Sequence, residues 1–328
     1  MKAIFIGVVA SFFFASTFII NRSMELGGGS WLWSASLRYI FMIPFLMVVV
    51  FFRGNFKSLL KEMRARPFQW LLWSSVGFGL FYTPITFAAA YGPGWLVSGT
   101  WQTTIIAGSL LVPFLKTKVE TEKGPILIKG EIPVKGLVFS SVILVGVIIL
   151  QVQQASTVNI NTMLLGALPV IIAAFAYPLG NRKMMQICDG RLDTFQRVLG
   201  MTIASMPFWL FVSVFGYLAH GAPSKSQLTQ SLLVAICAGV IATVLFFYAT
   251  DLARNSTKQM AAVESTQSGS VIFSVLGEMI FLSAAIPSNV SLVGLSLVVI
   301  GMILHSALSN RGTTMIKGVS KKGSFNYK

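Results

Sequence analysis

Charged side chains are scarce in this chain. Only 11% of its 328 residues are charged and only 10 are acidic, whereas a soluble domain carries about 25% charged residues. Hydrophobic residues make up 55% of the sequence, and the mean hydropathy is +0.76. No hydrophilic stretch is long enough for a separate soluble domain. This composition excludes a soluble globular protein and indicates a polytopic membrane protein.

Cysteine and histidine are also rare. Cys188 and Cys237 fall in a basic loop and an apolar stretch, so neither a disulfide nor a metal site is expected. His220 and His305 are isolated, which argues against an enzyme with clustered catalytic groups, and no cofactor is expected. The glycines at 27–29 precede neither a strand nor a lysine, so a phosphate-binding loop is excluded.

Ten apolar stretches run through the sequence, and each is close to the ~20 residues that cross a ~30 Å hydrocarbon core. We expect an all-α integral membrane protein. The expected spans are Ala3–Ile20, Trp31–Phe52, Phe68–Ala90, Trp95–Leu115, Val134–Gln151, Met163–Gly180, Gln196–Leu218, Ser231–Thr250, Gln259–Ser283 and Val290–Leu308.

The distribution of positive charge predicts the orientation of these spans. The net charge is +15, and of 25 Lys and Arg all but Arg22, Arg38 and Lys225 fall on one side of the ten-span arrangement. Basic residues in short loops mark the cytoplasmic side, so both termini are expected in the cytoplasm. This topological role accounts for the basic residues, and no nucleic-acid partner is expected.

The two halves of the sequence resemble each other. Residues 7–22 and 166–182 both begin with glycine and end in Asn-Arg, and the polar triplet at 100–102 matches that at 265–267. Further matches pair Arg38 with Arg197, Gly79 with Gly239, and Gly146 with Gly301. We therefore predict two five-helix repeats, 1–151 and 163–308, followed by a basic cytoplasmic tail at 309–328.

An odd number of helices per repeat has a topological consequence. The first repeat enters the membrane from the cytoplasm and the second from outside, so the repeats are inverted. Inverted repeats are typical of secondary transporters that alternate between inward and outward states around a midplane site. The competing interpretation is that duplication only built a stable bundle.

Two segments carry a resemblance to a known family. The stretch AAVESTQSGSVIFSVLGEMIFL from Ala261, and the repeat end from Gly294 to Gly301, resemble the drug/metabolite transporter superfamily with two EamA-like repeats, and among it the multidrug resistance efflux transporters. The resemblance implies the ten-helix inverted fold. Many members carry a glutamate about ten residues before the glycine that matches Gly294. This chain has Ser283–Ala285 there and Glu278 earlier.

Two glutamates in one apolar stretch are the sharpest functional signal. A carboxylate inside a bilayer costs about 2.5–3.5 kcal/mol unless it is protonated, paired or hydrated. On an ideal helix Glu264 and Glu278 share one face, about 21 Å apart. In small multidrug exporters of this superfamily a membrane glutamate alternately binds a proton or a cationic drug. The resemblance implies such a relay here, although those glutamates lie on a first helix and the stretch 3–20 has none.

The alternative is that arginines neutralise both carboxylates structurally. Arg38 lies at a depth similar to that of Glu278, and its repeat mate Arg197 at a depth close to that of Glu264. Two symmetry-related ion pairs are therefore expected under this interpretation. Asp251 is expected to pair with Arg254.

Polar and aromatic residues elsewhere are candidates for the wall of a central cavity. Aromatic faces suit a lipophilic cation, although ordinary packing explains the same residues individually. The candidates are Gln102, Gln267, Tyr82, Trp101, Tyr177 and Tyr248.

These observations predict a secondary active transporter of the bacterial plasma membrane. We expect proton-coupled efflux of lipophilic cations or drugs by alternating access. The alternatives are export of an amino acid or other metabolite and a carrier of the nucleotide-sugar type. An enzyme, receptor or scaffold fits less well, because the loops are short and no catalytic cluster is present. The expected partners are a small cationic substrate and the lipid bilayer, and the oligomeric state stays open.

Overall fold

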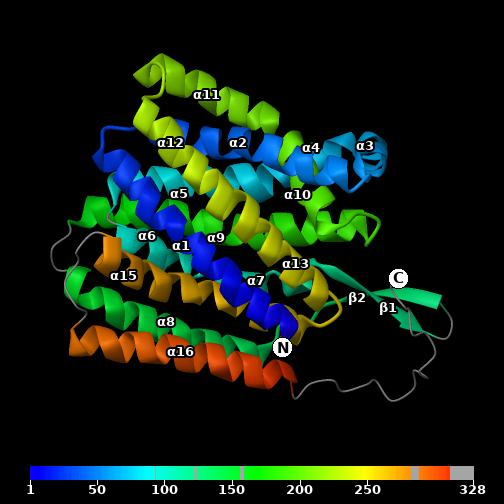
Figure 1. The fold of residues 1–328 in the computed structure, drawn as a ribbon. Helices are drawn as coiled ribbons and strands as arrows, with labels where there is room; N and C mark the ends of the chain where they lie inside the picture. Colours follow the sequence, from blue (N-terminus) through cyan, green and yellow to red (C-terminus); the bar gives the residue numbers. More distant parts are fainter. Residues whose placement is uncertain (93, 122–123, 156–158, 282–287, 311–328) are drawn as a thin grey trace.

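Long helices lying side by side form most of the protein (Figure 1). The computed structural model describes residues 1–310 except 93, 122–123, 156–158 and 282–287. Many large hydrophobic side chains on the helices are exposed, among them Phe5, Phe12 and Phe211. Large exposed apolar surfaces mark contact with a partner or a membrane. The α-helices are α1 (Lys2–Leu26), α2 (Trp31–Phe52), α3 (Phe56–Ala65), α4 (Pro67–Ser74), α5 (Leu80–Tyr91), α6 (Gly94–Trp101), α7 (Thr104–Leu110), α8 (Val134–Ala155), α9 (Ile160–Cys188), α10 (Thr194–Ala204), α11 (Met206–His220), α12 (Lys225–Val234), α13 (Thr243–Ala253), α14 (Thr257–Ser265), α15 (Gly269–Phe281) and α16 (Asn289–Asn310).

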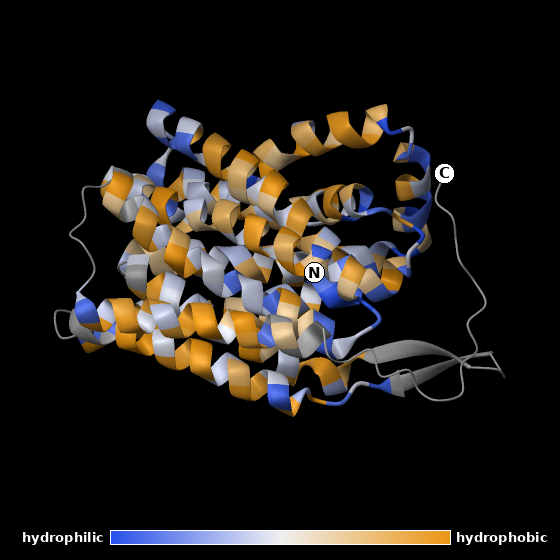
Figure 2. Ribbon diagram, turned by 60° about the horizontal axis from the view of Figure 1, so that its bottom comes forward, coloured by the Kyte–Doolittle hydropathy of each residue, from blue (hydrophilic) through white to orange (hydrophobic). Residues whose placement is uncertain are grey.

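Six helical stretches in the described part of the chain are long and apolar enough to cross a membrane. They are Lys2–Leu26, Trp31–Phe52, Pro67–Tyr91, Val134–Gln151, Ile160–Cys188 and Lys225–Ala253. Helices α10 and α11 add a seventh if their 47° bend belongs to one span. The described residues of the expected ranges are mostly helical, but 94–114 and 257–281 are interrupted and Asn289–His305 is short. The ten-span count therefore stays a prediction. Hydrophobic residues dominate the long helices, and hydrophilic ones gather toward their ends (Figure 2).

Hydrogen bonds show which helix ends lie together. The start of α2 meets the start of α12, where Gln227 Nε2 donates to the Ser30 carbonyl at 2.7 Å. On the other face, Arg66 at the end of α3 donates to the Ile187 carbonyl near the end of α9 at 3.2 Å. The Lys2 ammonium lies 5.8 Å from the Tyr248 ring near the end of α13. The N-terminus thus shares a face with the ends of α2, α9 and α13 (Figure 1).

Two elements in the loops depart from the sequence prediction. Strands β1 (Lys116–Thr121) and β2 (Gly124–Lys129) form an antiparallel hairpin in which Lys116 pairs with Lys129, and they are the strands found in the described part of the chain. Helix α3 occupies the basic segment after α2, and its one buried residue, Leu59, packs into the core. Each element lies in a loop that follows an apolar stretch. Hydropathy identifies apolar spans, and it does not predict the secondary structure of the polar loops between them.

Four irregular turns interrupt the spans at positions that match between the halves. The π-helices η1 (Ser75–Gly79) and η3 (Ala235–Ala242) contain the matched glycines Gly79 and Gly239. Helices α6 and α7 are separated at Gln102, and η4 (Thr266–Ser268) separates α14 from α15 at Gln267. A further 3₁₀ turn, η2 (Val112–Phe114), follows α7. Such interruptions are frequent at functional sites because they free backbone groups.

The helices exchange partners between the halves. Helix α1 packs along η3 and α13, and α9 packs along η1 and α5. The closest approach is a glycine pair: a Cβ at Gly180 would collide with the backbone of Gly77. Small residues of this kind let membrane helices pack closely.

Candidate functional site

A buried ion pair joins α9 to α14. Arg182 Nε donates to Glu264 Oε1 at 3.0 Å, and its Nη2 donates to Oε1 at 2.6 Å and to Oε2 at 2.7 Å. Both side chains are only 6% exposed. Helix α7 covers the pair with Gly108, where a Cβ would collide with the carboxylate. Because this geometry is charge-assisted and close to bidentate, the pair is a strong, specific contact.

The expected pairing of Glu264 with Arg197 is wrong. Arg197 Nη1 instead contacts Asp251 Oδ1 at 2.5 Å, and its Nη2 donates to the Phe247 carbonyl at 3.3 Å. The expected pair of Asp251 with Arg254 is also wrong, because Arg197 takes that carboxylate. The sequence predicted that Arg197 and Glu264 lie at a similar depth in the membrane. Their partners depend instead on the direction in which each helix turns these side chains.

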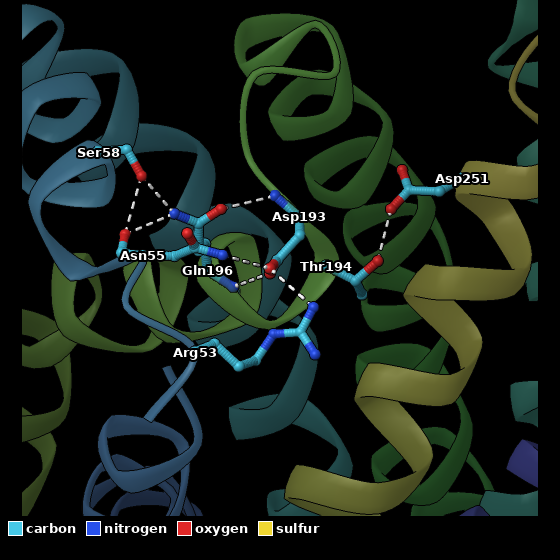
Figure 3. Close-up of polar contacts among 7 residues, drawn as sticks. All are labelled: Arg53, Asn55, Ser58, Asp193, Thr194, Gln196 and Asp251. Carbon is cyan, nitrogen blue, oxygen red and sulfur yellow. Dashed lines mark hydrogen bonds and ion pairs between the residues drawn. The ribbon is translucent and has the colours of Figure 1, made fainter. Parts of the chain in front are cut away.

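A polar network ties the end of α2 to the start of α10 (Figure 3). Asp193 caps α10, because its Oδ1 accepts a hydrogen bond from the backbone nitrogen of Gln196 at 2.9 Å. In return, Gln196 Oε1 accepts from the backbone nitrogen of Asp193 at 2.8 Å. Arg53 lies 3.3 Å from Asp193, and Gln196 Nε2 donates to Ser58 Oγ at 2.6 Å. Thr194 Oγ1 donates to Asp251 at 2.8 Å. The network connects the two predicted halves on the N-terminal face.

Arg38 is buried, and no carboxylate of the described side chains contacts it. It is 1% exposed, and its Nη2 donates to the Ala238 carbonyl in η3 at 3.0 Å. Its guanidinium carbon lies 4.1 Å from the centre of the Tyr82 ring, a cation–π contact. Nε and Nη1 have no hydrogen-bond partner. The Tyr82 hydroxyl is held by Asn21, whose Nδ2 donates to it at 3.0 Å, so the ring has a fixed orientation.

A small cavity adjoins Arg38. Its volume is about 10 Å³, which is room for about one water molecule. The lining residues besides Arg38 are Phe14, Thr17, Phe18, Phe81, Ile85 and Trp101. Thr17 Oγ1 is buried and has no partner. This cavity is too small for a substrate in this conformation, and its mostly apolar wall contains one positive charge.

Aromatic rings pack beside this cavity. The rings of Phe81 and Tyr177 have centroids 4.5 Å apart, and Trp101 lies 5.2 Å from Phe81 and 5.7 Å from Tyr177. The structure thus brings Tyr82, Trp101 and Tyr177 together with Arg38. Tyr248 lies elsewhere, 37% exposed and close to Lys2.

The two matched glutamines sit at the helix interruptions and are buried. Gln102 Nε2 donates to the Ser98 carbonyl at 2.9 Å and contacts Ser270 Oγ at 3.5 Å. Neither amide atom of Gln267 has a hydrogen-bond partner. Unpaired buried amides are costly, so these positions depart from simple packing.

The other predicted glutamate lies outside the described side chains. Glu278 falls on α15, but its side chain and hence the proposed contact with Arg38 are not described. The expectation that Glu278 and Glu264 share one face assumed an unbroken ideal helix. Because η4 interrupts the helix between them, that assumption fails. Helix α1 extends to Leu26 and includes Glu25, which lies in its last turn rather than mid-span.

Sequence reasoning missed Arg182. It placed this residue just beyond a span ending at Gly180, whereas α9 continues to Cys188 and buries the guanidinium. Two signals pointed to it: the repeated Asn-Arg pair and the need of Glu264 for a counter-charge. Among the described residues, no group of three or more His, Cys, Asp or Glu could hold a metal ion.

Apolar helices with interrupted turns and a buried ion pair define a multi-pass helical membrane protein. A family model described as "EmrE: Putative multidrug resistance efflux transporter" matches residues 1–311, and the chain belongs to this family of the drug/metabolite transporter superfamily. Membership of this family indicates a membrane transporter of a small molecule.

Several known proteins are similar to this chain. "Uncharacterized protein YjlA" of Bacillus subtilis (strain 168) is 57% identical over 309 residues, which cover 94% of this chain and 95% of that protein. "Uncharacterized 42.1 kDa protein in intracellular alkaline protease 3'region" of Shouchella clausii is 51% identical over 270 residues, or 82% and 70% of the two chains. A solved structure titled "Crystal structure of protein" has a TM-score of 0.70 over 95% of this chain and 99% of that chain. At 14% identity this likeness concerns the fold alone.

Proposed function

We propose that the protein is a proton-coupled secondary transporter of the plasma membrane that exports a small organic molecule. It works by alternating access between two inverted five-helix repeats. Three features support this proposal: the exchange of partners between α1–α13 and α9–α5, the matched π-helices, and the interruptions at Gln102 and Gln267. Inverted repeats with discontinuous helices around a midplane site are the usual design of secondary transporters.

The observation that carries the coupling is the buried pair of Arg182 and Glu264. A proton on Glu264 removes its charge and weakens the contact that joins α9 to α14. Proton binding and helix separation are then linked, and each favours the other. A pocket of about 210 Å³ opens on the N-terminal face and is lined by Lys2, Gln259 and Val263 among others. Val263 belongs to α14, so this pocket reaches the helix that carries Glu264.

The substrate is bound in the opened form of the cavity beside Arg38. Phe81 and Trp101 line the cavity, and the Tyr177 ring packs against both of them. These aromatic faces support the lipophilic cation that the sequence predicts. No described carboxylate lines that cavity, and Glu264 is occupied by Arg182. The metabolite alternative therefore stands beside the cation, and the experiment below includes both classes.

A neutral pair at 182 and 264 should uncouple transport from protons. We expect Arg182→Gln/Glu264→Gln to fold, because it removes both charges together, and to exchange substrate without moving protons. The measurement is internal pH in proteoliposomes that hold a pH-sensitive dye. Tetraphenylphosphonium, phenylalanine and 3-phenylpropanoate serve as probes, alongside tracer exchange of each.

The matched control is the exposed pair Glu62 and Arg191, which lie 2.8 Å apart. Its double Gln variant should keep the coupling of the wild-type protein. If the neutral 182/264 variant still moves protons with substrate at the wild-type ratio, the coupling role of Glu264 is refuted. The transport proposal itself would be refuted if the wild-type protein exchanged neither the probes nor any member of a wider panel of small organic molecules.

The proposed topology predicts opposite labelling of two loops. With both termini in the cytoplasm, a cysteine at Lys225 is expected outside and one at Lys61 inside. In intact cells an impermeant maleimide should label Lys225→Cys and spare Lys61→Cys until the membrane is opened. The native Cys188 and Cys237 are first replaced by alanine. Equal labelling of both positions in intact cells would contradict the orientation.

A further inference from the structure

Arg38 stands apart from the other buried arginines. In the described part of the chain, Arg38, Arg182 and Arg197 are buried. Arg182 contacts Glu264 and Arg197 contacts Asp251, whereas Arg38 contacts no carboxylate that the structure describes. The comparison with Arg197 is the sharper one, because the two occupy matched positions in the repeats. Among the described side chains, Arg197 has a carboxylate partner and Arg38 has none.

The unpaired charge faces the cavity. Arg38 lines it and is 1% exposed, with Nε and Nη1 unpartnered. The single carbonyl of Ala238 and the face of Tyr82 engage the rest of the guanidinium. A buried guanidinium cannot lose its proton, and a buried charge without a counter-ion is costly. This cost is tolerable where the missing partner arrives with a ligand.

The other residues that line the cavity indicate the chemical character of the rest of that ligand. Phe14, Phe81, Ile85 and Trp101 offer apolar and aromatic surface. Thr17 adds one buried hydroxyl without a partner, which can donate to an oxygen of the ligand. No described carboxylate lines the cavity, so nothing there offers an ionic partner to a cationic group.

We propose that the cavity beside Arg38 is a binding site for the carboxylate group of a substrate with an apolar or aromatic body. This proposal deepens the proposed function by naming the substrate class. The guanidinium and the Thr17 hydroxyl hold the anionic group, and the ring cluster covers the body. Since the cavity now holds about one water, the helices around it separate to admit the ligand.

Equilibrium binding to the purified wild-type protein in nanodiscs tests this without any transport. The probes share one skeleton: 3-phenylpropanoate carries a carboxylate, 3-phenylpropanamide is neutral, and 3-phenylpropylamine is a cation. Phenylalanine separates a plain acid from an amino acid, and binding of either carboxylate supports the site. We expect the carboxylate to bind about 10- to 100-fold more tightly than the amide, the range for a charged hydrogen bond. The amine should bind no better than the amide.

Variants locate the effect at Arg38. Arg38→Gln should lose the preference for carboxylate over amide, and Arg38→Lys should keep part of it. Arg64→Gln, on the exposed face of α3, is the matched control and should bind as wild type does. If Arg38→Gln does not fold, the ligand series on wild-type protein and on Arg38→Lys still decides. Tighter binding of the amine than of the carboxylate, or an unchanged preference in Arg38→Gln, overturns the proposal and leaves Arg38 a structural cation. Cation exchange in the proteoliposomes together with that result would preserve the transport proposal.

Discussion

Glu264→Gln is expected to destabilise the folded protein by about 3–5 kcal/mol. The variant keeps the shape of the side chain but leaves Arg182 buried without its counter-ion, and breaking a buried pair from one side has costs of this size. Arg182→Gln should cost less, because the orphaned carboxyl group can take up a proton and become neutral, whereas a guanidinium cannot lose its charge. The double Gln variant should be more stable than Glu264→Gln, since no buried charge is then left unpaired.

Thermal unfolding of the purified variants in detergent, with their abundance in the membrane, measures this cycle. The exposed pair of Glu62 and Arg191 is the control, and its neutralisation should change stability by less than about 1 kcal/mol. Strictly additive costs of the two single substitutions would mean that Arg182 and Glu264 do not depend on each other. The contact between Arg182 and Glu264 would then add no interaction free energy to the stability of the protein.

Gly180→Ala is expected to destabilise the crossing of α9 with η1 by about 3 kcal/mol or more. The added methyl would collide with backbone atoms of Gly77, and a backbone cannot swing aside as a flexible side chain does. The two helices must then separate, and the ring cluster that packs between α9 and α5 loses its contacts.

The readout is the unfolding temperature and the yield of monodisperse protein. Gly136→Ala is the matched control in α8, because the nearest atom to its added Cβ lies at 3.5 Å, an ordinary contact. A Gly180→Ala protein as stable as Gly136→Ala would contradict the close approach of the two helices.

Hydropathy predicted the helices because membrane insertion depends on local composition. The expected span Trp31–Phe52 matches the bounds of α2, and the described residues of the other expected ranges are mostly helical. It did not predict where helices break. Gln102 and Gln267 were found as matched polar residues, but that each lies at an interruption appeared only in the structure.

The candidate site was predicted in part. The residues Glu264, Arg38, Tyr82, Trp101 and Tyr177 were all found from their type and position, and the last four lie together around the central cavity or its ring cluster. Their partners were not. A substrate of cationic type was expected from acidic residues in the spans, whereas the cavity contains a cation of its own.

The sequence by itself determined that the chain is a helical membrane protein and that its apolar spans contain ionisable residues. Lipid forces the backbone to satisfy its hydrogen bonds within helices, and a 20-residue apolar stretch can be read from local composition. Only the tertiary structure decided that Arg182 neutralises Glu264 and that Asp251 neutralises Arg197. It also decided that Arg38 lies beside a cavity with no carboxylate partner among the described side chains. Ion pairing requires two atoms within about 3 Å, and that distance depends on the rotation and crossing of helices far apart in the chain.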